Sequence, residues 1–263
     1  MKIRRILSLM LRHFYLIKGS FPRIFDLIYW PTVQIILWGF VSKFFTMYSS
    51  YFGNAVGVIL TAAILYDFLF RSSISYNMLF LEEIWSRNLI NLFVSPLRSS
   101  EVICALTSTA LLRTLLGLVP AVFIAMPLFD ISIFKLGLPL YLLLLSLYMF
   151  GVTLGLLVTA GLIRFGPSFE NVAWASLFFI APLGCIYYPV DILPDWVKPL
   201  ALSFPLAHIF EEMRSILVNN TVNYKNISLA IGLNIFYIGL GVSIFYKAYK
   251  SAKIKGTLVN IGE

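Results

Sequence analysis

The sequence has 263 residues, of which 60 % are hydrophobic and only 12 % are charged, and its formal net charge is +8. Since soluble domains carry about 25 % charged residues, this composition excludes an ordinary soluble domain and favours a chain that resides in a membrane. The excess of cations does not indicate a nucleic-acid-binding protein, because the cations flank apolar segments and are not gathered on one polar surface.

The N-terminal segment, 1–23, predicts an interfacial helix. Its cations are spread along the segment and no uninterrupted apolar core is present, so we do not expect a cleavable signal. Apolar residues recur with helical spacing on one face: Ile3, Ile6, Leu7, Met10, Phe14 and Ile17. Because Arg5, Ser8 and Arg12 lie opposite, we expect this helix to rest on the cytoplasmic membrane surface, where cations favour anionic lipids.

Six later segments are apolar enough to be membrane spans, since about 20 apolar residues are needed to cross the hydrocarbon core. The predicted spans cover residues 24–46, 53–70, 102–126, 137–163, 171–188 and 228–246. The fifth is short and contains Pro182. With no internal repeat, the sequence predicts an all-α polytopic membrane protein that forms one domain over residues 1–263.

The distribution of the 20 lysine and arginine residues predicts the orientation of the spans. Most of them lie before the first span, in the loop 71–101, after the fourth span or after the sixth. Cytoplasmic loops carry such an excess of cations, so we expect both termini and the loop 71–101 on the cytoplasmic side and the loop 189–227 outside.

Charged residues within spans are costly and often functional, so two positions stand out. Asp67 and Arg71 have the i, i+4 spacing of an ion pair on one helix. Arg113 lies inside the third span, where it either faces the interior and pairs or extends towards the inner surface. No chain of buried acids is present for a proton relay. Cys104 and Cys185 lie in apolar runs without metal-ligand spacing, so we expect no metal site.

The segment 80–95 has the pattern of an amphipathic helix in the loop after the second span. Leu81, Trp85, Leu89 and Leu92 share one face, whereas the polar face carries Glu82, Glu83, Arg87 and Asn91. Glu83 and Arg87 are spaced as an ion pair, and Pro96 ends the helix. The pattern is typical both of a lever that another protein moves and of a helix that lies on the membrane surface.

The segment 189–210 is too apolar for a free loop and too broken for a span. Four prolines interrupt it, at positions 189, 194, 199 and 205. We expect short re-entrant helices that help to close the outer end of a pathway, because irregular backbone at membrane depth survives only when it is buried in protein or lines a wet cavity. A plain interfacial anchor is the alternative. Sequons at Asn219 and Asn226 are too common to carry weight.

No motif of a soluble enzyme is present. The polar residues of the long outside loop leave a membrane-embedded enzyme open, although their spacing specifies no reaction: Asp191, Asp195, His208, Glu211 and Glu212. His13 and His208 are expected on opposite sides of the membrane and therefore in different sites. The sequence also lacks a phosphate-binding loop, so ATP, if it drives this protein, is bound by another chain.

Three blocks together resemble a family. They read YWPTVQIILWGF in the first span, IWSRNLINLFVSPLRSSEVI after the second, and YYPVDILPDWVKPLALSFPLAHIFEEMRSIL before the last. In this order they resemble the membrane subunits of type-2 ATP-binding-cassette exporters. The resemblance implies paired membrane subunits that dock two separate ATPase subunits, a coupling helix after the second span that fits the ATPase, and re-entrant helices near the outer face.

The resemblance also implies roles for particular residues. The candidate ATPase contacts on the coupling helix are Glu82, Glu83, Trp85, Arg87, Asn88 and Asn91. The aromatic candidates that line or flank the pathway are Tyr29, Trp30, Trp38, Trp174 and Phe178. Arg113 is a further pathway candidate, because it is a charge within a span. The candidate outer-gate residues are Tyr188, Pro189, Asp191 and Pro194. No catalytic residue is expected in this chain, and ATP and Mg²⁺ would be bound by the partner ATPase.

The expected function is therefore that of an exporter permease in the bacterial inner membrane. Two copies of this chain are favoured over two different membrane subunits, and the bilayer is a further partner. The substrate is expected to be an amphiphile such as a lipid-linked glycan, a lipo-oligosaccharide or a drug. The alternatives are an ion-coupled secondary transporter, a membrane-embedded lipid-modifying enzyme and a non-transporting scaffold; the lack of inverted repeats argues against the first.

Overall fold

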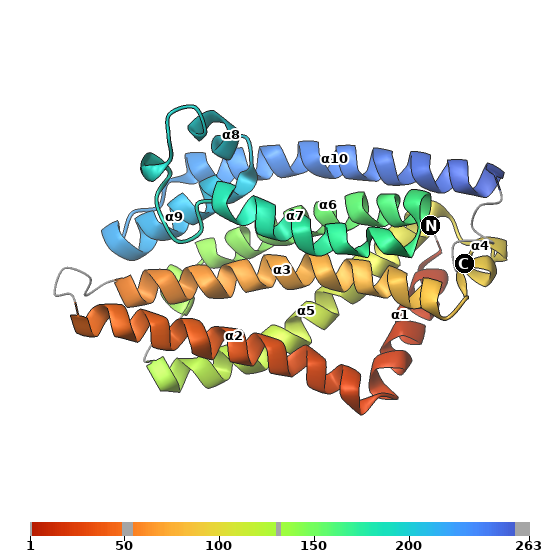
Figure 1. Cartoon of the computed structure of the whole chain (residues 1–263), viewed down its shortest axis with the longest axis horizontal. Helices are drawn as coiled ribbons and strands as arrows, with labels where there is room; N and C mark the ends of the chain where they lie inside the picture. Colours follow the sequence, from red (N-terminus) through yellow and green to blue (C-terminus); the bar gives the residue numbers. More distant parts are fainter. Residues whose placement is uncertain (1, 49–54, 130–132, 256–263) are drawn as a thin grey trace.

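The computed structural model describes residues 2–48, 55–129 and 133–255, and all regular secondary structure within them is helical (Figure 1). The longer helices run along one common axis, and the helices of both termini reach the same end of the bundle (Figure 1). The helices are α1 (Ile3–Lys18), α2 (Phe21–Tyr48), α3 (Ala55–Trp85), α4 (Leu89–Val94), α5 (Ser99–Phe129), η2 (Ile133–Leu136), α6 (Pro139–Phe165), η3 (Pro167–Phe169), α7 (Glu170–Leu183), η4 (Val190–Ile192), α8 (Lys198–Leu202), α9 (Pro205–Asn219) and α10 (Tyr224–Lys255).

Five of these helices, α2, α3, α5, α6 and α10, are long and apolar enough to cross a membrane, which is consistent with a multi-pass membrane protein. The predicted fifth span, 171–188, is wrong at its end, because α7 has only 14 residues and stops at Leu183. The backbone turns there: Gly184 caps the helix, and Cys185 has a positive φ of 51°. Helix α7 is therefore too short to span a bilayer alone.

The centre of the bundle is the contact between α3 and α6. In their most apolar windows, 67 % of α3 and 72 % of α6 are buried, against 17 % of α2. The glycines of a Gly-x-x-x-Gly motif in α6 make this contact close: a Cβ atom on Gly151 would lie 2.0 Å from Ser72 Oγ, and one on Gly155 would lie 2.8 Å from the Tyr76 side chain. Small residues of this kind allow membrane helices to approach each other.

Hydrogen bonds between helices add to this packing. Thr159 donates to Asn77 over 3.2 Å between α6 and α3, and Asn234 of α10 donates to Ser146 of α6 over 2.5 Å. Because buried polar groups are costly without a partner, these bonds fix how α3, α6 and α10 are rotated against one another.

The predicted boundaries after the second span are wrong. Helix α3 continues without a break to Trp85, whereas the prediction ended the span at 70; its predicted start at 53 lies outside the described residues. The prediction placed residues 71–75 in a cytoplasmic loop, but Ser72 and Ser73 are fully buried in α3. The Arg71 Nε donates to Asp67 Oδ2 over 2.7 Å, as predicted for this pair. Polar residues packed between helices do not end a span.

The prediction of a single helix over 80–95 is also wrong. The backbone leaves the helix after Trp85, Arg87 adopts a φ of 51°, and α4 begins at Leu89. This break removes the i, i+4 geometry predicted for Glu83 and Arg87. Leu81, Leu89 and Leu92 are buried as predicted, but Trp85, expected on the same face, is 57 % exposed.

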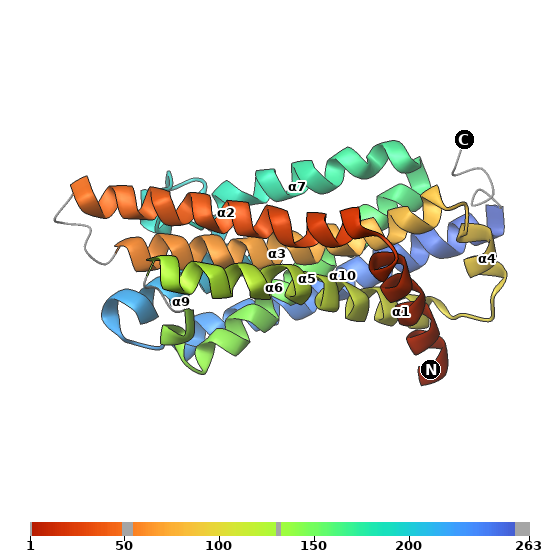
Figure 2. The same ribbon diagram turned by 90° about the horizontal axis from the view of Figure 1, so that it is seen from below.

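The N-terminal segment forms a shorter helix than predicted, since α1 ends at Lys18 and residues 21–23 begin α2. Helix α1 packs at an angle to the bundle axis, against α5 (Figure 2). It buries Leu9, His13 and Ile17, whereas Ile3 and Phe14 of the predicted apolar face remain exposed. Thus α1 has one face for the bundle and a second apolar face that is free to contact lipid.

The segment 189–210 consists of η4, α8 and the first residues of α9, at the end of the bundle opposite α4 (Figure 1). Its prolines stand where helices begin: Pro199 and Pro205 occupy the first turns of α8 and α9. Leu206, Phe210 and Met213 of α9 are fully buried against the bundle. The segment is a folded cap, and its re-entry to membrane depth stays a prediction.

Candidate functional site

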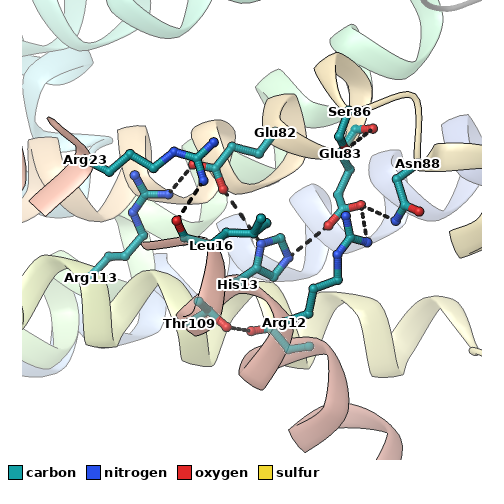
Figure 3. Close-up of polar contacts among 11 residues, drawn as sticks. Arg12, His13, Leu16, Arg23, Glu82, Glu83, Ser86, Asn88, Thr109 and Arg113 are labelled. Atoms are coloured by element: carbon teal, nitrogen blue, oxygen red, sulfur yellow. Dashed lines mark hydrogen bonds and ion pairs between the residues drawn. The ribbon is translucent and has the colours of Figure 1, made fainter. Parts of the chain in front are cut away.

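A cluster of charged side chains, most of them buried, joins α1 to the last turn of α3 and to α5 (Figure 3). Glu82 and Glu83 end α3, Arg12 and His13 lie on the inner side of α1, and Arg113 comes from α5. The cluster stands beside the break between α3 and α4. It is the largest concentration of buried charge in the described residues and is therefore the candidate site.

Glu83 is the most enclosed carboxylate of the cluster, with 1 % of its surface exposed. Its Oε2 lies 2.9 Å from Arg12 Nη1 and accepts a 2.6 Å hydrogen bond from Asn88 Nδ2, while its Oε1 lies 3.4 Å from His13 Nε2. One side chain therefore connects the end of α3, the residue that precedes α4, and α1.

Glu82 faces the other side of the same imidazole. Its Oε1 accepts a 3.2 Å hydrogen bond from Arg113 Nη1, and its Oε2 lies 3.9 Å from His13 Nδ1 (Figure 3). His13 is fully buried between the two carboxylates. Arg113 thus faces the interior and pairs, which is one of the two arrangements the sequence allowed.

The charges of this cluster compensate one another. Carboxylates at the C-terminal end of a long helix are disfavoured by the helix dipole, so Glu82 and Glu83 need nearby cations. Arg12 and Arg113 supply them, and Arg23 lies beside Glu82 while donating to the carbonyl of Leu16. Because buried charges are tolerated only when paired, the cluster binds α1 firmly to α3 and α5.

A second contact ties α1 to the start of α5. Glu101, which is buried, accepts hydrogen bonds from the backbone N–H groups of Lys2, over 2.8 Å, and Arg98, over 3.0 Å. Arg5 lies 3.5 Å from the same carboxylate and also donates to the carbonyl of Pro96. Helix α1 is therefore held on both sides of α4, by Glu83 before it and by Glu101 after it.

The structure separates the predicted ATPase contacts into two groups. Glu82 and Glu83 face α1 and are largely buried, whereas Trp85, Arg87 and Asn91 are exposed. Asn88 is half-buried and connects the groups through its bond to Glu83.

Sequence reasoning missed the residues that bind Glu83, namely Arg12 and His13, as well as Glu101. The spacing of His13 at four residues from both Leu9 and Ile17 was an available signal of its burial.

The predicted pathway residues lie mainly on one side of the bundle, on α2 and α7 (Figure 2). Tyr29 and Trp30 are exposed on α2, and Trp174 and Phe178 are exposed on α7. Trp38 stacks on Tyr187, with ring centroids 4.4 Å apart. Arg113 does not belong to this aromatic surface, because it is part of the charged cluster.

The predicted outer-gate residues lie in and around η4. Tyr188 donates to the carbonyl of Pro182 over 2.7 Å, whereas Pro189, Asp191 and Pro194 are exposed. The Val190 N–H donates to Glu211 over 2.7 Å, which fixes this turn against α9.

Four of the five polar residues considered for an enzyme have a local structural partner, and the fifth, Asp191, is exposed in η4. Asp195 pairs with Lys198 at 2.8 Å, and this pairing lowers the pKa of the Asp195 carboxyl. Glu211 pairs with Arg214, while Glu212 accepts the Asn223 N–H over 2.6 Å. His208 contacts the carbonyl of Leu202. These partners account for the four side chains as structural groups of the cap.

The described residues contain no group of three or more side chains suited to a metal, and Cys104 and Cys185 are free thiols. A comparison of the sequence with protein-family models and with curated proteins gives no match. The features that bear on function are therefore the sequence pattern, the charged cluster, the exposed side chains of Trp85, Arg87 and Asn91 beside it, and the aromatic side chains of α2 and α7.

Proposed function

We propose that this chain is the permease subunit of an ATP-driven exporter and that a separate ATPase subunit moves it. The main support for the proposal is the exposed corner formed by residues 85–94, where the chain passes from the end of α3 into α4. Trp85, Arg87, Asn91 and Val94 are exposed there, yet the corner is tied to three longer helices through Glu83 and Glu101. An exposed element with so many buried connections is suited to receive a displacement and pass it on.

The proposed transmission begins at α4. The ATPase binds the exposed corner, and a shift of α4 is passed through the bond between Asn88 and Glu83 to α3 and α1. Arg113 extends the connection to α5. ATP favours one of two conformations because the ATPase binds it more tightly in that one, and this difference in affinity drives the change. ATP and Mg²⁺ bind to the partner, so this chain needs no catalytic residue.

The aromatic surface of α2 and α7 supports the proposal of a dimer. Helix α2 buries only 17 % of its most apolar window, which leaves Tyr29, Trp30, Trp174 and Phe178 available to a second subunit. We propose that two copies enclose the pathway here, with α7 and the residues after it forming the fifth of six crossings. Aromatic surfaces suit an amphiphilic substrate, and Tyr188, Pro189, Asp191 and Pro194 would form the outer gate.

The proposal is tested by co-purification in mild detergent from cells that contain the native partner. The variant Trp85→Ala/Arg87→Glu alters only exposed side chains of the corner. We expect wild type to retain a nucleotide-binding protein and the variant to retain at least tenfold less of it, because two contacts worth about 1 kcal/mol each are removed. Trp196→Ala is the matched control, since Trp196 is 82 % exposed next to α8, and it should retain the partner.

Recovery of wild type without any nucleotide-binding partner would contradict the proposal. Transport by the chain alone in proteoliposomes with an ion gradient would then favour a secondary transporter. Loss of turnover on replacing Asp191, His208 or Glu211 by alanine would favour the enzyme.

A further inference from the structure

A groove with basic walls lies between the start of α5 and the last turns of α10. Its volume is about 780 Å³, within the range of about 300–1,000 Å³ that is typical of small-molecule sites. Arg98 and the hydroxyl-bearing Ser99 and Ser100 lie on one wall, and Lys250 and Lys253 lie on the other. The start of α5 and the last turns of α10, which line the groove, lie at the end of the bundle where α4 also lies (Figure 1).

Helical spacing aligns the residues of the α10 wall. Val242, Tyr246, Lys250 and Lys253 follow one another at intervals of four, four and three residues and therefore share a face. From Val242 to Lys253 this face extends about 16 Å along the helix axis. It changes from apolar in the interior of the bundle to cationic at its end.

The cations of the groove lack carboxylate partners among the described residues. Arg98, Lys250 and Lys253 are exposed and take part in none of the ion pairs found there. Glu101, the nearest acidic residue along α5, is not among the residues that line the groove. Its carboxylate is buried and is bound to Arg5 and to the Lys2 N–H. Within the described part of the chain, these three positive charges of the groove therefore have no carboxylate partner.

A second groove on the other side of α10, with a volume of about 740 Å³, also combines apolar walls with cations, Arg164 and Lys247. The end of α10 thus carries positive charge on both sides. Free phosphate would be attracted by the charges alone, but it would not use the apolar wall of Ile103, Val242 and Tyr246. A phospholipid uses both, since its phosphate lies at the surface and its acyl chains lie in the bilayer.

We propose that the groove between α5 and α10 binds the headgroup phosphate of an anionic membrane phospholipid, with Arg98, Lys250 and Lys253 as its ligands and Ile103, Val242 and Tyr246 against an acyl chain. This inference does not depend on an ATPase partner. It places a lipid contact beside both α4 and the Glu101 connection, so lipid composition would influence the corner that we propose to move.

The inference is tested by native mass spectrometry of the full chain in detergent with equal amounts of phosphatidylglycerol and phosphatidylcholine. We expect wild type to retain phosphatidylglycerol selectively. In Lys250→Gln/Lys253→Gln this selectivity should fall on the order of tenfold, because each of the two lysines supplies part of the electrostatic attraction to the anionic headgroup. Arg98→Gln, on the opposite wall, is an independent variant with the same expected direction.

Two controls make the result specific. Lys135→Gln/Lys225→Gln removes the same charge from exposed positions in η2 and at the start of α10, and it should leave the selectivity unchanged. Lys250→Arg/Lys253→Arg should keep it, because the charge is retained. Equal phosphatidylglycerol retention by wild type and the glutamine variants would overturn the proposal. Displacement of the lipid by millimolar inorganic phosphate would assign the site to a free anion instead.

Discussion

Glu83 shows, at the scale of one residue, that burial changes the role inferred for a charged side chain. On the sequence it is one of several acids on a polar helix face, available to a partner protein. In the structure the same carboxylate faces Arg12, His13 and Asn88 with 1 % of its surface exposed. Its role in the proposed function is therefore to connect α4 with α1. The side chains proposed to contact the ATPase directly are Trp85, Arg87 and Asn91.

Glu83→Gln should destabilise the protein, because it leaves the Arg12 guanidinium without its carboxylate partner. We expect a loss of roughly 2 kcal/mol, below the 3–5 kcal/mol of a fully buried pair, since Arg12 keeps 34 % of its side chain exposed. Thermal unfolding in detergent should show a melting temperature lower by roughly 4–8 °C. Asp191→Asn, an exposed position in η4, is the control, and identical melting of both variants would refute the role of Glu83.

At the scale of elements, the contact between α3 and α6 orders the bundle. The Gly-x-x-x-Gly motif of α6 places Ser72 and Tyr76 against glycines, so polar and aromatic side chains of α3 fit beside the α6 backbone. This contact explains why α3 continues through residues 71–75: its serines are enclosed by a neighbouring helix and do not face lipid.

Gly151→Ala and Gly155→Ala should each push these two helices apart. Overfilling a packed contact costs about 1–3 kcal/mol, and neither Ser72 nor Tyr76 has room to move, since both are fully buried. Gly232→Ala in α10 is the matched control: no atom lies within 4 Å of its Cβ, so the better helix propensity of alanine should leave stability unchanged or raise it by up to 1 kcal/mol. A similar melting temperature for all three variants would contradict this account of the packing.

At the scale of the whole molecule, α1, α4 and the last turns of α10 gather at one end, while α8 and α9 form a cap at the other (Figure 1). The exposed corner, the charged cluster and the basic groove therefore share one end. For an ATPase to reach the corner and for anionic lipid to fill the groove, this end has to be cytoplasmic, as the cation distribution also predicts.

Cysteine labelling tests this orientation. In a chain whose Cys104 and Cys185 are replaced by alanine, a membrane-impermeant maleimide should label Trp196→Cys on intact cells, because that position is exposed beside α8. Asn91→Cys, exposed on α4, should react only after the membrane is permeabilised. Labelling of Asn91→Cys on intact cells would exclude the proposed contact with a cytoplasmic ATPase.

The sequence by itself determined the properties that depend on composition and on local spacing. Apolar windows identified the long helices α2, α3, α5, α6 and α10 as candidate spans, and the i, i+4 spacing identified the pair of Asp67 and Arg71. These features are set by residues close together along the chain. Hydropathy did not predict where α3 ends, because this depends on which helices surround its polar residues. Ser72 and Ser73 are buried by neighbouring helices, and α3 continues past them to Trp85.

Only the tertiary structure decided which residues form the candidate site. Arg12 and His13 lie about seventy positions from Glu82 and Glu83 in the sequence, and Arg113 lies thirty-one positions from Glu82, so no local pattern links them. They meet because α1 folds back across the bundle and packs against α5 beside the end of α3. Burial then forces the charges to pair, since an isolated charge in this interior would cost several kcal/mol.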